Sequence, residues 1–157
     1  MGIYPLRVYA DTSVFGGVFD EEFAEATRGF FDEVVQGRFR LVTSILVRNE
    51  LAPAPERVRE FARGALAEAE IVEVREASTA LRAAYLAAGV VSERWRADAL
   101  HVAVATVGSC RLIVSWNLRH HVSLDRIRRY CAVNALEGYP PIEIRTPAEV
   151  VQYEEDV

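Results

Sequence analysis

The chain contains no lysine, and all 18 of its basic residues are arginine. This absence excludes every mechanism that needs a lysine ammonium group, including P-loop phosphate binding, Schiff bases and pyridoxal chemistry. The 23 acidic residues outnumber the arginines, which gives a formal net charge of −5. That charge argues against a surface built uniformly for polyanions. A nucleic-acid ligand would therefore need a local arginine patch, or metal ions that reverse the sign of an acidic pocket.

Cysteine and long apolar runs are also scarce. Cys110 and Cys131 are too few and too scattered for a disulfide framework or a zinc site. No apolar stretch reaches the roughly 20 residues that a membrane span requires. The first residues lack the basic and apolar regions of a signal peptide. We therefore expect a cytoplasmic protein that does not contact a membrane.

Length and composition are those of an ordinary globular protein. The chain has 157 residues, of which 51% are hydrophobic and 26% are charged. This length suits one domain and is sufficient to bury a substantial core. We expect a single domain over residues 1–157.

Short β-rich runs alternate along the chain with segments of helical character. Strands are expected at 6–11, 38–44, 70–75, 110–116 and 142–146, and helices at 21–37, 44–52, 55–70, 78–89, 96–108, 123–138 and 146–153. Strands that alternate with helices require crossover connections, which favour a mostly parallel sheet covered on both faces. The sequence therefore predicts an α/β protein, a three-layer α/β/α sandwich with a mostly parallel central sheet.

Two of these helices begin with capping signals. Thr43 or Ser44 can cap the helix over 44–52. The stretch "TPAE" at 146–149 combines a capping threonine, a proline in the first turn and a glutamate at the third helical position. This pattern is typical of a capping box.

Polar side chains are expected near one edge of the sheet, where ligands bind in folds of this kind. Asp11 closes the first strand, and Glu50 lies about two turns into the helix after the second strand. Asp98 lies early in the helix before the fourth strand, and Asn117 follows that strand directly. Each has an ordinary alternative when taken alone: a helix cap, a solvent-facing acid or a turn residue.

Asp98 is the hardest of these residues to explain by ordinary structure. The helix that it introduces, "ALHVAVATV", is otherwise nearly all hydrophobic. A carboxylate that faces such a core needs a partner, because unpaired burial costs several kcal/mol. Arg94 or Arg96 is one kind of partner, and a hard cation shared with the other acids is the alternative.

Four stretches of the chain resemble the sequence blocks of the PIN-domain nucleases, in order and at suitable spacing. They are "VYADTSVFGG", "SILVRNEL", "RADALHVAVA" and "LIVSWNLRHHV". The resemblance extends over essentially the whole chain and is strongest to bacterial PIN proteins grouped with VapC-type toxins. It implies a PIN-like fold and an endoribonuclease that depends on Mg²⁺ or Mn²⁺. It also implies the toxin of a toxin–antitoxin pair, with RNA, a cognate antitoxin and a second copy of the chain as partners.

The resemblance also assigns residues by position. Asp11, Glu50 and Asp98 match the three principal acids and are expected to be catalytic, with Glu50 holding the attacking water or acting as its base. Asn117 falls where many members have a further aspartate, and its amide oxygen can still ligate a cation. The expected metal ligands are therefore Asp11, Asp98 and Asn117.

Further residues around this site have supporting roles in the prediction. Ser115 matches a hydroxyl residue that the family places two positions before its last acid. Thr12 and Ser13 are expected to steady Asp11 or to touch the substrate. Arg119 and His120 follow the fourth strand, where they could contact phosphate.

Two other residues have a functional and a structural interpretation. His101 lies one helical turn after Asp98, so it could ligate a metal, although a hydrogen-bonded buried histidine is the more common case. Trp116 could stack on an unpaired base, but packing against the sheet is favoured.

Two other functions are alternatives to a nuclease. A catalytically weak PIN-like module that binds RNA or protein is favoured by the amide of Asn117 in place of an acid. A phosphohydrolase with Asp11 as covalent nucleophile is disfavoured, because Ser13 stands where that class has a second aspartate and lysine is absent.

Overall fold

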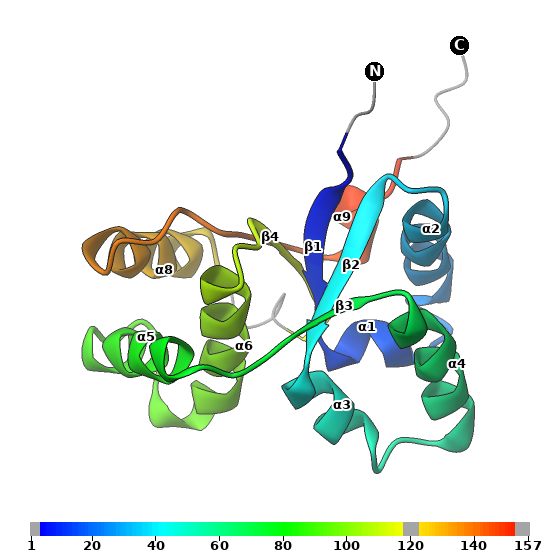
Figure 1. Ribbon diagram of the computed structural model, residues 1–157, viewed down its shortest axis with the longest axis horizontal. Helices are drawn as coiled ribbons and strands as arrows, with labels where there is room; N and C mark the ends of the chain where they lie inside the picture. Colours follow the sequence, from blue (N-terminus) through cyan, green and yellow to red (C-terminus); the bar gives the residue numbers. More distant parts are fainter. Residues whose placement is uncertain (1–3, 118–122, 153–157) are drawn as a thin grey trace.

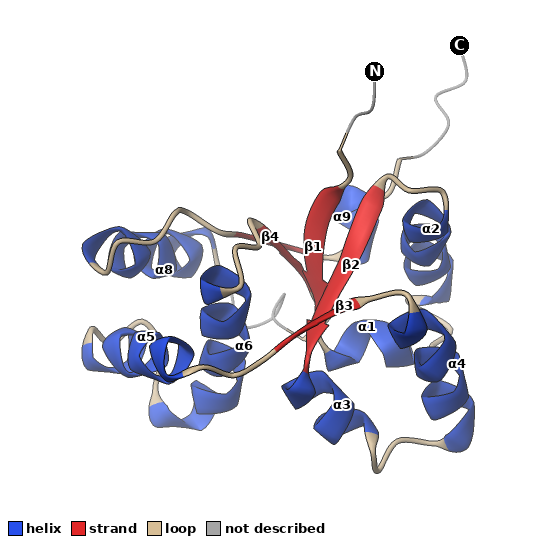
Figure 2. Cartoon of the chain, in the orientation of Figure 1, coloured by secondary structure: helices blue, strands red, loops and turns tan. Residues whose placement is uncertain are grey.

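A parallel sheet with helices on both sides forms the centre of the protein (Figure 1 and Figure 2). The computed structural model describes residues 4–117 and 123–152. Its strands are β1 (Leu6–Ala10), β2 (Phe39–Ser44), β3 (Glu70–Val72), β4 (Leu112–Val114) and β5 (Glu143–Arg145). They are ordered β3-β2-β1-β4-β5, and every neighbouring pair is parallel. The predicted α/β/α sandwich is confirmed, and each expected strand is present.

The helices cover both faces of this sheet. They are α1 (Thr12–Gly17), α2 (Ala24–Val35), α3 (Ile45–Leu51), α4 (Glu56–Ala67), α5 (Glu76–Ala87), the 3₁₀ helix η1 (Glu93–Trp95), α6 (Arg96–Val107), α8 (Leu124–Leu136) and α9 (Pro147–Val150). Figure 1 shows α2 and α4 on one side of the sheet and α5, α6 and α8 on the other. In the part of the chain that is described, no helix is long and apolar enough to cross a membrane.

Helix α1 is the main element that the sequence does not predict. It has six residues and ends in two glycines, which are poor helix formers and look like a turn in the sequence. Val14 and Phe15 on this helix are fully buried. Packing of these two side chains therefore outweighs the low intrinsic helix propensity.

The two predicted capping signals have different outcomes. The capping box at Thr146 is confirmed, with the Thr146 N–H donating to Glu149 Oε1 at 3.0 Å. Ser44 stands at the N-cap of α3, but its side chain makes no capping hydrogen bond. Its hydroxyl lies 2.7 Å from the Tyr9 hydroxyl, and Thr43 Oγ1 donates to Ala10 O. The predicted N-cap position of Ser44 is confirmed, but the capping hydrogen bond is absent because both hydroxyls contact polar groups of β1 instead.

The core is formed largely by the three inner strands, β2, β1 and β4, and by α6. The last three residues of β1 and all three residues of β4 are buried, as expected for strands covered on both faces. Helix α6 is buried along nearly its whole length after Asp98, which confirms the prediction of a buried helix. The chain crosses from one side of β1 to the other between β3 and β4. Ligands bind at such a reversal in strand order, at the carboxyl ends of the strands.

Candidate active site

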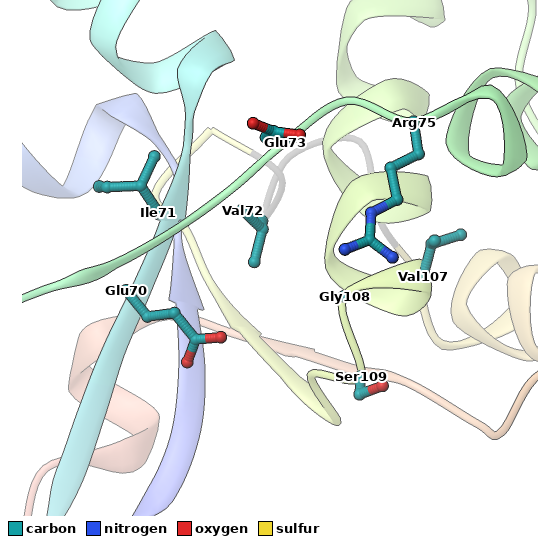
Figure 3. Close-up of a pocket in the computed structure, with 8 residues that line it drawn as sticks. All are labelled: Glu70, Ile71, Val72, Glu73, Arg75, Val107, Gly108 and Ser109. Carbon is teal, nitrogen blue, oxygen red and sulfur yellow. The ribbon is translucent and has the colours of Figure 1, made fainter.

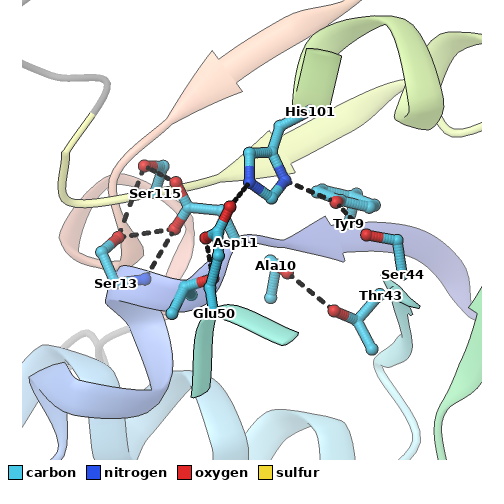
Figure 4. Close-up of polar contacts among 10 residues, drawn as sticks. Tyr9, Ala10, Asp11, Ser13, Thr43, Ser44, Glu50, His101 and Ser115 are labelled. Carbon is cyan, nitrogen blue, oxygen red and sulfur yellow. Dashed lines mark hydrogen bonds and ion pairs between the residues drawn. The ribbon is translucent and has the colours of Figure 1, made fainter. Parts of the chain in front are cut away.

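Asp11 lies at this reversal, directly after β1, and is only 5% exposed (Figure 4). Its Oδ1 accepts hydrogen bonds from the Ser13 N–H at 3.1 Å and from Ser13 Oγ at 2.5 Å. Its Oδ2 accepts from Ser115 Oγ at 2.5 Å. A carboxylate offers about four acceptor positions, so about one position remains open on Oδ2. Asp11 thus both caps α1 and keeps an oxygen available.

Among the described residues, the donors that hold Asp11 are the neutral Ser13 and Ser115. Burial raises the pKa of its carboxyl above the ordinary value, and the hydrogen bonds from Ser115 and Ser13 offset this in part. Within residues 4–117 and 123–152, no arginine forms an ion pair with it. A buried carboxylate of this kind is strongly stabilised by any cation that reaches it.

Glu50 extends from α3 toward the same region, and its side chain is 43% exposed. Thr12 Oγ1 donates to Glu50 Oε2 at 2.5 Å, and His101 Nε2 lies 2.8 Å from Glu50 Oε1. Partial burial raises the pKa of Glu50, but the hydrogen bonds from His101 and Thr12 outweigh it, and the net effect is a lowered pKa. Glu50 is therefore an ionised carboxylate that reaches solvent.

His101 is buried behind Glu50, with a side chain that is 5% exposed. Its Nδ1 lies 2.7 Å from the Tyr9 hydroxyl, which in turn lies 2.7 Å from Ser44 Oγ. The interpretation of His101 as a hydrogen-bonded buried histidine is confirmed. Tyr9 and Ser44 are absent from the predicted site residues. One feature of the sequence could have indicated Tyr9 as a site residue. Tyr9 stands two residues before Asp11, and residues two apart in a strand face the same side of the sheet.

Asp98 lies half-buried one turn before His101 on α6, as predicted. Burial lowers the pKa of His101, but the hydrogen bond and charge of Glu50 and the charges of Asp11 and Asp98 outweigh it, so this pKa is raised. All three predicted acids therefore act electrostatically on one buried ring. The arginines considered as partners of Asp98 have other contacts: Arg96 pairs with Glu93, and Arg94 lies over the Trp95 ring.

The segment after β4 is tied to Asp11 through Ser13. Ser13 Oγ accepts hydrogen bonds from the backbone N–H of Trp116 at 2.9 Å and of Asn117 at 3.4 Å. Asn117 is thus brought close to Asp11, and Asn117 itself is exposed. The other predicted residues of this segment, Arg119 and His120, lie outside the described residues.

Trp116 packs in the interior, as favoured from the sequence. Its ring stacks on Phe23 with centroids 4.1 Å apart, and its Nε1 donates to Thr27 Oγ1 at 2.9 Å. These contacts occupy the ring, so Trp116 is a packing residue.

A metal ion fits this site by donor chemistry. Carboxylate and amide oxygens such as those of Asp11, Asp98 and Asn117 are the ligands that Mg²⁺ and Mn²⁺ prefer, and Asp11 keeps an acceptor position open. In the described parts of the chain, however, no three His, Cys, Asp or Glu side chains lie close enough together to hold an ion. The predicted ligand set therefore stays a prediction.

A separate pocket lies between β3 and the C-terminal end of α6 (Figure 3). It is lined by Glu70, Ile71, Val72, Glu73, Arg75, Val107, Gly108 and Ser109. Arg7, at the start of β1, binds Glu70 and the carbonyl oxygens of Gly108 and Ser109. None of the predicted site residues lines this pocket, so we place the candidate chemistry at Asp11.

Comparison with known proteins identifies the class to which this fold and site belong. The family model of the PIN domain matches residues 8–122, which is more than half of the chain. The chain belongs to the PIN-domain family, as the four sequence blocks predict. No curated protein matches the chain significantly.

Two solved structures show the same fold at low sequence identity. VapBC2 from Rickettsia felis, bound to a DNA fragment from its promoter, is 12% identical with a TM-score of 0.58, and the match covers 90% of this chain and 98% of that one. FitAcB from Neisseria gonorrhoeae is 13% identical with a TM-score of 0.57, covering 89% of this chain and 97% of that one. The predicted likeness to VapC-type proteins is thus confirmed at the level of the fold.

Proposed function

We propose that the chain is a divalent-metal-dependent endoribonuclease that hydrolyses phosphodiester bonds of RNA. The observation that carries this proposal is the buried carboxylate of Asp11 at the reversal of strand order. It is held by hydroxyls, retains an open acceptor position and lies in the same electrostatic environment as Glu50 and Asp98. Membership of the PIN-domain family supports nuclease chemistry at this place.

Asp11, Asp98 and Asn117 would hold Mg²⁺ or Mn²⁺. When bound, such an ion lowers the pKa of water and offsets the negative charge of the scissile phosphate. Ser13 and Ser115 keep the Asp11 carboxylate oriented, since their hydroxyls donate to different oxygens of that group.

Glu50 is suited to take the proton of the attacking water. It is ionised, reaches solvent and is fixed by Thr12 on one oxygen and His101 on the other. As Glu50 accepts that proton, the water oxygen bonds to phosphorus and the bond to the 3′ oxygen breaks. A solvent water molecule then gives a proton to the leaving oxygen, which yields a 3′-hydroxyl and a 5′-phosphate.

The biological setting that we propose is a toxin–antitoxin pair. The VapBC2 and FitAcB structures share the fold over about nine-tenths of this chain. We accordingly propose a cognate antitoxin and a homodimer as partners, in addition to RNA.

The test is cleavage of a labelled single-stranded RNA in the presence of Mn²⁺. The wild type should cleave it, and Asp11→Asn should abolish cleavage because the amide removes the charge while keeping the shape. Asp32→Asn, which changes an exposed acid on α2, is the matched control and should keep full activity.

Two observations favour a second candidate, a PIN-like module that binds RNA or protein with little turnover. Asn117 stands in place of an acid, and no set of three metal-binding side chains is assembled among the described residues. Equal RNA affinity of wild type and Asp11→Asn, with cleavage by neither, would contradict the nuclease and support this module.

A further inference from the structure

A chain of buried polar groups stands behind Glu50 (Figure 4). It runs from Ser44 Oγ to the Tyr9 hydroxyl, from that hydroxyl to His101 Nδ1, and from His101 Nε2 to Glu50 Oε1, with separations of 2.7, 2.7 and 2.8 Å. Tyr9 and Ser44 are fully buried, and His101 nearly so. The chain thus links the end of β2, across β1 and α6, to the only member that reaches solvent, Glu50.

The hydrogen-bond pattern of this chain is determined by Glu50 and Tyr9, the two groups that contact the His101 ring. Glu50 is ionised and can only accept, so His101 Nε2 must carry a hydrogen and donate it. Burial raises the pKa of Tyr9, so its hydroxyl keeps its hydrogen. A neutral His101 accepts from Tyr9 at Nδ1, and a charged His101 donates to it. In either state Nε2–H points at Glu50, so the orientation does not depend on the charge of the ring.

The Tyr9 hydroxyl fixes the orientation of the imidazole ring. A flipped ring would present a C–H group to the buried Tyr9 hydroxyl and to Glu50 Oε1. The flip would therefore remove both hydrogen bonds of the buried ring, which is unfavourable because its polar nitrogens would lose their partners. The ring therefore stays in the orientation that holds Glu50 Oε1, while Thr12 holds Oε2.

The arrangement is not what stability alone would favour. Apolar side chains of similar volume fill a core at least as well as buried polar groups do. Three polar side chains are nevertheless buried behind a glutamate that is itself 43% exposed. Departures from the rules of core packing are expected at functional sites.

We propose that Tyr9 and His101 are positioning residues that hold the Glu50 carboxylate in the orientation needed to take the proton of the attacking water. The proposal rests on the proposed function, because that function assigns Glu50 its role. Neither residue touches the substrate: His101 acts through Glu50, and Tyr9 acts through His101.

The test is Tyr9→Phe, which removes one oxygen and keeps the ring. Its matched control is Tyr85→Phe, since Tyr85 is equally buried and its hydroxyl donates to Asn134, outside the chain of groups behind Glu50. In Mn²⁺-supported RNA cleavage, Tyr9→Phe should lower kcat by about 10- to 100-fold with KM unchanged. Tyr85→Phe should leave both unchanged after correction for the folded fraction.

A second measurement needs no activity. Long-range ¹H–¹⁵N spectra of ¹⁵N-histidine protein, with His101 assigned through His101→Gln, should show the hydrogen on Nε2. Tyr9→Phe should shift the Nδ1 resonance, and Tyr85→Phe should not.

The outcomes separate the two proposals. The positioning role is overturned if Tyr9→Phe has the same kcat as the wild type, or if both tyrosine variants lose the same amount of activity. In either case, cleavage of RNA by the wild type still supports the nuclease. A His101 that carries its hydrogen only on Nδ1 also overturns the positioning role. If the wild type cleaves no RNA but gives the expected spectra, the nuclease is overturned. The catalytic role of Tyr9 and His101 is then overturned with it, whereas the hydrogen-bond pattern is upheld.

Discussion

Ser115 Oγ donates to Asp11 Oδ2 over 2.5 Å, so two residues 104 positions apart in the chain meet at the candidate site. Asp11 follows β1 and Ser115 follows β4, and these neighbouring strands lie on the two sides of the reversal in strand order. The topology of the sheet therefore builds the site, because parallel neighbours bring their carboxyl ends to the same edge.

Removal of the Ser115 hydroxyl should weaken metal binding in a pH-dependent way. This hydrogen bond lowers the pKa of Asp11, so Ser115→Ala should raise the already raised pKa further and increase the protonated fraction. Mn²⁺ affinity measured by calorimetry should fall by about 10-fold, and by more at pH 6 than at pH 8. Ser92→Ala, at an exposed serine, is the control. Unchanged affinity in Ser115→Ala would contradict the assignment of Asp11 as a ligand.

The contact between His101 and Glu50 should stabilise the fold over a limited pH range. The pKa of His101 is raised from 6.5, so its contribution is complete below 6.5 and is lost as the pH rises through the folded-state value. The pKa of Glu50 is lowered from 4.5, so its contribution is complete above 4.5 and is lost as the pH falls through the folded-state value. The pair should therefore contribute most between pH 4.5 and 6.5.

A double-mutant cycle of His101→Gln and Glu50→Gln measures this contribution. Urea unfolding should give a coupling energy of about 1 kcal/mol near pH 5.5, since Glu50 is partly exposed to solvent. The coupling should decrease at pH 9. A coupling energy that grows between these two pH values would show that the ring does not act as a donor to a carboxylate.

A side chain at Gly17 should destabilise the fold, whereas a side chain at the neighbouring Gly16 should be tolerated. A Cβ at Gly17 would lie 2.8 Å from both Thr27 Oγ1 and Trp116 Nε1, which form a hydrogen bond with each other. Gly17→Ala should lower the free energy of unfolding by about 1–3 kcal/mol in a urea titration. Gly16→Ala meets no atom within 4 Å, and should be neutral or stabilising by up to about 1 kcal/mol. Equal stability of the two variants would contradict this packing.

The alternation of strands and helices made the fold predictable from sequence, whereas much of the site depends on contacts between distant segments. Asp11 was recognisable because an acid at the end of an apolar strand is conspicuous. Tyr9 was not, because an aromatic residue within a strand looks like core until the register with Ser44 and His101 is known. The Ser44 hydroxyl likewise looks like the capping group of α3 until that register is known.

Side chains that face one another across the sheet carry no local signal in the sequence. Ser115 is predicted only through the resemblance to PIN-domain blocks, which encodes the three-dimensional arrangement indirectly. The chain of groups behind Glu50 lies partly outside that pattern, so only the structure shows it.

The most direct test of the account is the position of a bound Mn²⁺ ion, located by anomalous scattering from a crystal soaked in Mn²⁺. We predict an anomalous peak about 2.1 Å from oxygens of Asp11 and Asp98, and its loss in Asp11→Asn. A peak that binds elsewhere, or no peak beside Asp11 at saturating Mn²⁺, would contradict the metal-dependent nuclease.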